Sequence, residues 1–335
     1  MVKGVATSII TVAVLMGSLL ACGGTTQVVT PNPELEPTVE QQSTEIIEEA
    51  SEEPNDAVDN KNQIQEASET SSEPPPSDRI IILGEDFVLA DVLAMGVVPI
   101  AATATLNDKF TGIERDTTGI QPLPSTEANL ELLASLRPDL IIATQYIIDY
   151  VDQDLLNGIA TTKIISGESW RERVISLGEI LDAPSQADSL LADYDLAVSE
   201  ARIELNADIS ISLATIYPGS TIAVWVDGPS NIPQTILDMG IELSPGIDDY
   251  PTARLGREFI TNERIGDLSS PIIILSQSST VEGEDESLRN IQSNSLWRNL
   301  PAVNSGKVFT INRLGYPGVE GRIRLISELV DVIME

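Results

Sequence analysis

The sequence predicts an α/β protein with two lobes, each built on a central, mainly parallel sheet. A single long helix joins the lobes, and a ligand cleft lies between them. Three observations support this fold. Short apolar runs rich in Ile and Val alternate with helical patterns from residue 79 onward. The alternation falls into two sets of elements. An uninterrupted helical pattern over residues 185–205 separates the two sets.

The first set defines an N-terminal lobe over residues 79–183. It opens with an apolar run at 79–83 that has the character of a buried strand. A helical pattern follows and ends at Gly96, and the next strand is expected to begin at Val97. This strand–helix–strand order implies parallel pairing. The further elements expected in this lobe are helices at 129–136, 147–158 and 169–181 and strands at 140–143 and 163–165.

The separating pattern defines a connecting helix over residues 184–206. Pro184 stands at its start, where the missing N–H of proline costs nothing. At 1.5 Å per residue the helix is about 30 Å long, which suits a strut between lobes. Residues 207–335 then form a C-terminal lobe. Its expected elements are strands at 213–217, 222–226, 271–275 and 307–311 and helices at 232–239, 288–300 and 318–334.

The first 78 residues have a different character. Lys3 precedes an apolar stretch at 12–21 that is too short for a comfortable membrane span and is typical of a signal-peptide core. A small residue then precedes the single cysteine of the chain, Cys22, in a pattern that resembles a lipobox. Residues 1–22 are therefore expected to be a lipoprotein signal peptide with Cys22 lipidated, the alternative being an ordinary cleaved signal peptide. Residues 23–78 are acidic, polar and proline-rich, and predict a disordered linker.

The composition excludes several functions. The chain carries a net charge of −33 and contains no histidine. So acidic a surface repels phosphate backbones, which argues against nucleic-acid binding. A lone cysteine excludes disulfides within the chain. The lack of histidine excludes His-centred acid–base catalysis and the usual zinc ligand sets, so no metal site or cofactor is expected. No nucleophile elbow, Walker loop or paired-acid motif occurs, so we expect no enzyme.

Three segments resemble one protein family. Residues 79–83 and 93–100 (LAMGVVPI) are similar to the opening strand and turn of the ABC-transporter substrate-binding proteins that carry ferric siderophores, vitamin B12 and haem. Residues 129–142 (NLELLASLRPDLII) resemble a second motif of that family, and residues 296–308 (LWRNLPAVNSGKV) a third. The resemblance covers residues 79–335. It implies a class III, helical-backbone binding protein whose lobes move little relative to each other.

The resemblance also implies how the protein meets its permease. In the family, one glutamate on each lobe contacts arginines of the permease. The matching residues here are Glu131 and Glu263, although Glu258 lies close to the second position. Two carboxylates at the tips of two lobes would set the orientation of docking. Solvated surface glutamates are the alternative reading.

Candidate ligand contacts follow the strands, because ligands of open α/β sheets meet the carboxyl ends of the strands. Phe87 and Tyr217 are two such residues. A ferric siderophore needs arginine for charge and aromatic rings for stacking. The ligand-binding candidates are therefore Arg313, Tyr316, Arg115, Arg254, Trp170, Tyr146 and Trp225.

The expected function is an extracytoplasmic, lipid-anchored component of an ABC importer that captures an Fe³⁺–siderophore complex and delivers it to the membrane permease. Its expected partners are that permease with its cytoplasmic ATPase, the iron chelate and the membrane, and the protein is expected to be a monomer. Vitamin B12 or haem remains the alternative cargo. A ligand sensor that docks on a membrane receptor, or an extracytoplasmic enzyme, is the alternative from another class.

Overall fold

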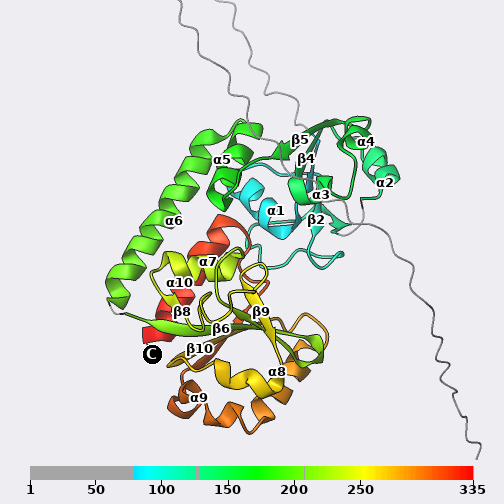
Figure 1. Ribbon diagram of the computed structural model, residues 1–335. Helices are drawn as coiled ribbons and strands as arrows, with labels where there is room; N and C mark the ends of the chain where they lie inside the picture. Colours follow the sequence, from blue (N-terminus) through cyan, green and yellow to red (C-terminus); the bar gives the residue numbers. More distant parts are fainter. Residues whose placement is uncertain (1–78, 126–127, 207, 335) are drawn as a thin grey trace, which may run out of the picture. The chain divides into compact units, whose positions relative to one another are not determined.

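The computed structural model describes residues 79–125, 128–206 and 208–334. The expected signal peptide with Cys22 and the expected linker lie outside the described residues. The described chain forms two α/β lobes joined by one long helix, as the sequence predicts (Figure 1). None of the helices within these ranges has both the length and the apolar character needed to cross a membrane.

The N-terminal lobe is built on a five-stranded parallel sheet with the order β3-β2-β1-β4-β5. Its strands are β1 (Ile80–Leu83), β2 (Ala101–Ala104), β3 (Gln121–Pro124), β4 (Leu140–Thr144) and β5 (Thr161–Ile165). Its helices are α1 (Glu85–Ala94), α2 (Leu130–Ser135), α3 (Gln145–Ile148), α4 (Gln153–Asn157) and α5 (Trp170–Ile180). β1 lies at the centre because its four residues are all buried and apolar, which suits a strand covered on both faces.

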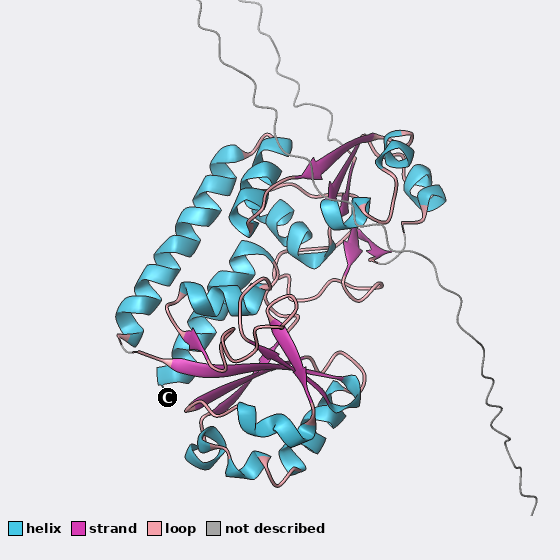
Figure 2. Ribbon diagram, viewed as in Figure 1, coloured by secondary structure: helices cyan, strands magenta, loops and turns pink. Residues whose placement is uncertain are grey.

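The C-terminal lobe contains a mixed sheet with the order β11-β10-β6-β7-β9, with β8 paired to β6. Its strands are β6 (Ser210–Tyr217), β7 (Thr221–Trp225), β8 (Glu242–Leu243), β9 (Arg257–Ile260), β10 (Ile272–Gln277) and β11 (Val308–Asn312). β6, β10 and β11 are parallel, whereas β7 and β9 run antiparallel. Helices cover both faces of this sheet (Figure 2). They are α7 (Asn231–Asp238), α8 (Glu284–Ser293), α9 (Pro301–Ser305) and α10 (Gly318–Met334).

The connecting helix α6 (Pro184–Leu205) runs along one side of both lobes (Figure 1). It begins at a proline and ends at Asn206, whose left-handed backbone (φ 34°) terminates the helix. α6 packs against α5 of the first lobe and against α10. One apolar cluster includes Ile82 of β1, Tyr194 of α6 and Leu329 of α10, so the two lobes share a core. This shared core favours a stiff connection between the lobes.

Several elements differ from the sequence-based prediction. The second strand begins at Ala101 and not at Val97, because Pro99 has no N–H to donate to a sheet. The predicted helix at 147–158 is two short helices, since Asp152 caps the start of α4 with its side chain. The predicted helix at 288–300 ends at Ser293 and continues as a 3₁₀ turn, Trp297–Asn299. β3, β8 and β9 were not predicted, and β3 contains two prolines that hide its strand character.

Gly318 fixes the contact between α1 and α10. Its backbone has φ +66°, and a Cβ atom there would lie 2.6 Å from Oδ1 of Asp91. We expect Gly318→Ala to lower the free energy of unfolding by at least about 1 kcal/mol more than Gly306→Ala. Gly306 has a similar φ of +74° but open space around it. Denaturant unfolding of both variants measures the difference, and equal losses would contradict the close contact.

Candidate functional site

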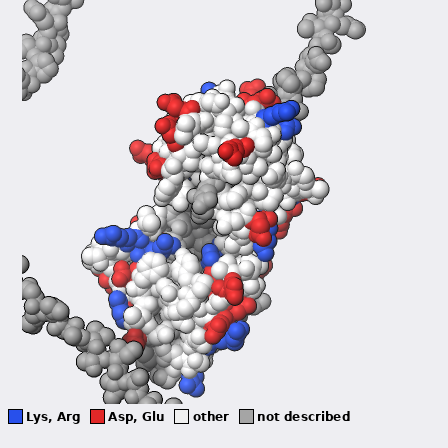
Figure 3. All heavy atoms as spheres, turned by 90° about the vertical axis from the view of Figure 1, so that its right-hand side faces the viewer, with Lys and Arg blue, Asp and Glu red and all other residues white. Residues whose placement is uncertain are grey.

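A cavity of about 420 Å³ lies between the lobes. The space-filling view shows the surface hollowed there, with Lys and Arg atoms along its edge (Figure 3). Its walls come from both lobes, from the helices α1, α5, α7 and α10 and the carboxyl ends of β4, β6, β7 and β10. Ligand pockets typically measure 300–1,000 Å³, so this cavity can hold a small chelate or most of a larger one.

The charge of the cavity is opposite to that of the protein. Four arginines line it, namely Arg173, Arg257, Arg313 and Arg322, and Asp91 is the only acidic residue in the described lining. The chain as a whole has a net charge of −33. Guanidinium groups gathered in a concave site attract anions and bind carboxylates through paired hydrogen bonds. The cavity is therefore suited to an anionic ligand.

Three of these arginines form no ion pair with a carboxylate within the described residues, and two of them, Arg173 and Arg257, are only partly buried. Arg173 of α5 donates only to the carbonyl oxygens of Gly167 and Glu168, both at 3.3 Å. Arg257 of β9 donates to the hydroxyl of Tyr217 at 3.0 Å and lies 5.4 Å from the ring centre of Trp225. One arginine comes from each lobe. Their positive charges are available to a ligand that bridges the cavity.

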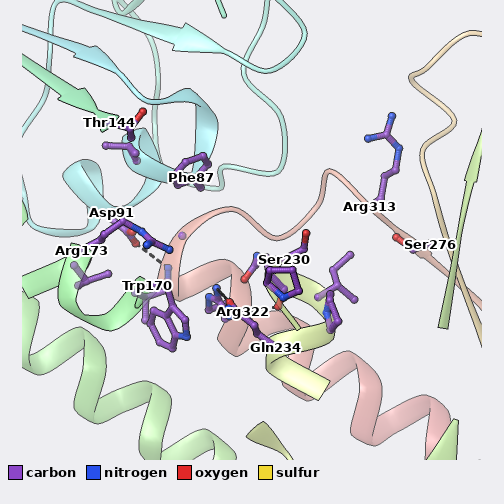
Figure 4. A pocket seen from close by; sticks show the side chains of 18 of the residues that line it. Phe87, Asp91, Thr144, Trp170, Arg173, Ser230, Gln234, Ser276, Arg313 and Arg322 are labelled. Carbon is purple, nitrogen blue, oxygen red and sulfur yellow. Dashed lines mark hydrogen bonds between the residues drawn. The ribbon is translucent and has the colours of Figure 1, made fainter. Parts of the chain in front are cut away.

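Arg322 is buried, with only 6% of its surface exposed. Its guanidinium lies 4.2 Å above the Trp170 ring and donates to Gln234 Oε1 at 2.9 Å and to Thr235 Oγ1 at 3.2 Å. Burial lowers the pKa of Arg322 to about 10, against the opposing effect of nearby Tyr194, Asp91 and Asp238. It remains charged at neutral pH and gives the floor of the cavity a fixed positive charge (Figure 4).

Arg313 directly follows β11 and is already paired. Its Nη2 lies 2.6 Å from Oε1 of Glu284, whose side chain is fully buried. The other oxygen of Glu284 accepts from the Ser278 backbone N–H at 2.6 Å. This pair holds the guanidinium at one end of the cavity (Figure 4). Because a carboxylate offsets its charge, Arg313 attracts an anion less strongly than an unpaired arginine does.

Asp91 of α1 reaches across to the other side of the cavity. Its Oδ1 accepts from the Val319 backbone N–H at 2.8 Å, at the start of α10. Burial raises the pKa of Asp91 to about 7, although the Val319 hydrogen bond and the charge of Arg322 oppose the shift. This carboxyl is thus partly protonated near neutral pH, which limits how far it offsets the arginines.

Aromatic rings complete the lining. Phe87, Trp170, Tyr217 and Trp225 all contribute to it, and Phe87 is 45% exposed at its edge. Trp170 packs edge-on against Tyr194, with 5.0 Å between ring centres, and Trp225 donates to Thr215 Oγ1 at 2.8 Å. These contacts fix the rings before a ligand arrives. Fixed rings beside arginines form a surface on which flat, partly apolar groups can stack.

The structure places three of the seven ligand-binding candidates in this lining: Arg313, Trp170 and Trp225. Phe87 and Tyr217, expected from their positions after strands, line it too. The strand-end rule located them because the carboxyl ends of the parallel strands β1 and β6 face the cavity.

The other four candidates lie outside the lining. Arg115 forms an ion pair with Glu320 at 2.6 Å. Tyr316 is 7% exposed, and its hydroxyl is already engaged because it donates to Glu328 of α10 at 2.5 Å. Arg254 is exposed beside β9. Tyr146 packs against Tyr150 at a second, smaller cavity of the N-terminal lobe.

The two docking candidates are both exposed. Glu131 lies in the first turn of α2, whose start is capped by the side chain of Asn129. Glu263 lies in a 3₁₀ segment, Asn262–Asp267, and hydrogen bonding to Thr261 lowers its pKa. Glu258, the rival position, is half-buried on β9. Both candidates are therefore accessible, charged carboxylates, one on each lobe.

Arg173, Arg257 and Arg322 were missed from the sequence. They stand inside helices or at the start of an unpredicted strand, so the strand-end rule does not find them. Arg322 did leave a signal. It shares the buried face of α10 with Val319, Ile326 and Leu329, at helical spacing. A charged residue on an apolar helix face needs buried partners or a ligand.

No group of three or more His, Cys, Asp or Glu side chains among the described residues is arranged to hold a metal ion. Fold and cavity together define the class of protein: a two-lobed binding protein with its site between the lobes.

Comparison with known proteins agrees with this class. The model of the periplasmic binding protein family matches residues 81–313. A probable siderophore-binding lipoprotein of Bacillus subtilis, YfiY, is 25% identical over 274 residues, covering 78% of this chain and 82% of YfiY. The structure of Staphylococcus aureus SirA complexed with staphyloferrin B superposes with a TM-score of 0.64 at 20% identity, covering 77% of this chain and 93% of SirA. B. subtilis FeuA complexed with ferri-bacillibactin gives a TM-score of 0.63 at 19% identity, covering 82% of this chain and 98% of FeuA.

The family model covers more than half of the chain. The protein therefore belongs to the periplasmic binding protein family, as the three sequence motifs indicate, and it has the two-lobe fold of the siderophore-binding members.

Proposed function

We propose that the protein captures an anionic ferric siderophore in the cavity between its lobes and delivers it to an ABC permease. The observation that carries this proposal is the gathering of four of the chain's 14 arginines around one cavity of a strongly acidic protein. The named ligands of YfiY, SirA and FeuA support it. The protein acts by binding and release, without catalysis.

Tryptophan fluorescence tests this function directly. Trp170 and Trp225 line the cavity, whereas Trp297 is 4% exposed in a separate apolar cluster behind the second sheet. The purified protein is titrated with ferric citrate, ferric 2,3-dihydroxybenzoate and ferrioxamine B, with cobalamin and haemin as rivals. Saturable quenching by ferric citrate or ferric 2,3-dihydroxybenzoate, absent for the iron-free form, supports the proposal, whereas quenching by the cationic ferrioxamine B alone contradicts it. Binding of cobalamin or haemin alone, or of nothing in the panel, contradicts it.

Three matched variants test whether the signal comes from the cavity. We expect the quenching to fall in Trp170→Phe and Trp225→Phe and to persist in Trp297→Phe. Quenching that persists in the first two variants and disappears in the third would place the ligand elsewhere.

The cellular setting of the protein is part of the proposal. Cys22 is lipidated, residues 23–78 tether the lobes, and the monomer works at the outer face of the cell membrane. The naming of YfiY as a lipoprotein supports this arrangement. Metabolic labelling with a palmitate analogue tests it, because Cys22→Ser should abolish incorporation while leaving the lobes folded.

Glu131 and Glu263 dock the loaded protein on basic sockets of the permease. We expect Glu131→Lys and Glu263→Lys each to reduce uptake of the radiolabelled ferric ligand about tenfold, because a cation facing a cation is repelled. Ligand affinity should stay unchanged, since neither residue lines the cavity. The matched control is Asp154→Lys. Asp154 is an exposed acidic residue in the first turn of α4, in the same lobe as Glu131. Equal uptake in all three variants would exclude this docking role.

A further inference from the structure

Two neighbouring strands of the C-terminal sheet, β6 and β10, change from apolar to hydroxyl-bearing side chains at the same register position. On the face of β6 that packs in the shared core, Ile211 and Leu213 are followed by Thr215. On the same face of β10, Ile272 and Ile274 are followed by Ser276. Thr215 and Ser276 are register partners in the parallel ladder. Both line the cavity, so the sheet replaces apolar side chains with hydroxyls where its core ends and the cavity begins.

The hydroxyl of Ser276 is buried without a partner. The residue is 1% exposed, and its Oγ makes no hydrogen bond within the described residues. Leaving a buried hydroxyl unpaired is unfavourable, and nearly all buried polar groups in proteins are paired. An alanine or valine at this position would continue the apolar face of β10. Because Ser276 lines the cavity, its hydroxyl is placed to bond to an atom of a bound ligand.

The hydroxyl of Thr215 is held in place by its neighbour. Its Oγ1 accepts from Trp225 Nε1 at 2.8 Å, which leaves its own hydrogen free to donate. Neighbouring strands lie about 4.8 Å apart, so two hydroxyls at the same register can both reach one small anionic group. Thr215 and Ser276 thus form a hydroxyl pair at one register position of the cavity wall, each with a hydrogen free to donate within the described residues.

Cations flank this hydroxyl pair. Arg313 follows β11, the strand beside β10, and lies at the same end of the cavity as Ser276 (Figure 4). Arg257 of β9 lies on the other side, over Trp225. Hydroxyl donors between guanidinium groups match an oxygen anion that is not itself bound to iron. A free carboxylate is such a group, whereas the oxygens of catecholates and hydroxamates are used to hold the metal.

We propose that the hydroxyl pair of Thr215 and Ser276 is a carboxylate subsite, so that the cargo is a ferric chelate of the carboxylate type. This inference rests on the proposed function and narrows the class of its ligand. The subsite fixes one end of the chelate on the C-terminal lobe, and Arg173 of the opposite lobe meets its other face.

The experiment compares ligand binding with stability in the purified full chain. Ferric citrate is the carboxylate probe, and ferric 2,3-dihydroxybenzoate and ferrioxamine B are the catecholate and hydroxamate probes. We expect wild type to bind ferric citrate most tightly. Ser276→Val should weaken that binding by about tenfold to hundredfold, as expected for a lost hydrogen bond to a charged group. Its melting temperature without ligand should be unchanged or higher, because no hydrogen bond within the protein is lost.

Ser212→Ala is the matched control. Ser212 lies on β6 as well and is fully buried, but its hydroxyl donates to the Ser244 carbonyl at 2.6 Å. We expect this variant to lose stability and keep its affinity. If wild type binds no ferric probe, the proposed function itself fails. If wild type prefers the catecholate probe, or if Ser276→Val binds ferric citrate as wild type does, the function stands and the carboxylate subsite is overturned. If wild type binds only the cationic ferrioxamine B, the proposal of an anionic ligand fails.

Discussion

Replacing either Arg173 or Arg257 by leucine is expected to weaken binding of the anionic ferric ligand by about tenfold to hundredfold. A hydrogen bond to a charged group contributes about 1.5–3 kcal/mol, and about 1.4 kcal/mol corresponds to a factor of ten. The double variant should lose close to the product of the two effects, because the residues belong to opposite lobes and share no partner. Fluorescence or calorimetric titration measures these affinities.

These two arginines should matter more than the other two in the lining. Glu284 offsets the charge of Arg313, and Arg322 donates hydrogen bonds to Gln234 and Thr235 of α7. Arg173 and Arg257 have no carboxylate within the described residues, so their attraction for an anion is not offset. Leucine keeps much of the apolar stem of arginine and removes the guanidinium group with its charge and its hydrogen-bond donors. The affinity of wild type should also fall as salt is added, and this dependence should be weaker in the double variant.

Two neighbouring arginines serve as controls. Arg171 lies on the same helix as Arg173 but is paired with Asp195 at 2.5 Å. Arg254 lies just before β9 and outside the cavity lining. Leucine at either position should leave affinity within about twofold of wild type. An effect of Arg254→Leu as large as that of Arg257→Leu would indicate that Arg254 binds the ligand and would contradict its position outside the cavity lining.

The sequence predicts the two sheets and their helices well because the central strands consist almost entirely of apolar residues. The run from Ile80 to Leu83 has no polar residue to confuse the pattern, and helices with clear ends follow it. Elements whose character comes from their neighbours are harder to predict. β3 reads as a loop because of its two prolines, and β9 lies among polar residues. They become strands only because β2 and β7 offer them free edges.

The residues of the cavity also divide into those that the sequence could predict and those that it could not. Trp170, Trp225 and Arg313 could be predicted, because each lies close to the carboxyl end of a strand and such ends meet in the cleft. Tyr316 has the same kind of position, yet its hydroxyl turns to Glu328 on the next helix. Sequence position gives the place of a backbone segment but not the direction of its side chain. Arg173 and Arg257 depend on that direction and on how the two lobes face each other.

The contacts across the lobes explain why a rigid strut suits this protein. Arg324 of α10 donates to the Gly112 carbonyl of the first lobe at 2.6 Å, and Arg115 is paired with Glu320. Together with the shared core, these contacts resist movement of one lobe against the other, so we expect the separation of Arg173 and Arg257 to change little on binding. A ligand then meets a site that is largely formed in advance, which reduces the entropy lost on binding.

Asp91 should make the protein less stable as the pH rises from about 4 to 7. Its pKa is about 7 in the folded protein, against 3.8 for an unburied aspartate. Between these values the folded state holds a proton that the unfolded state has lost. The free energy of unfolding therefore falls with pH, by at most about 1.4 kcal/mol per unit, and levels off above pH 7. Asp91→Asn should remove this dependence, because asparagine imitates the protonated acid and can still accept from the Val319 N–H.

Denaturant unfolding of wild type and Asp91→Asn at pH 5, 6, 7 and 8 measures this effect. The difference between the two curves is needed because burial raises the pKa values of Glu85 and Asp86 as well. We expect the free energy of unfolding of Asp91→Asn, relative to that of wild type, to rise steadily from pH 5 to 7. Asp116 should show the opposite dependence on pH. Hydrogen bonds to Thr118 lower the pKa of Asp116, so the stability that these bonds provide is lost only as the pH falls. A difference for Asp91→Asn that is flat, or that grows toward low pH, would show that this carboxyl is ionised in the folded protein and offsets one of the cavity's arginines.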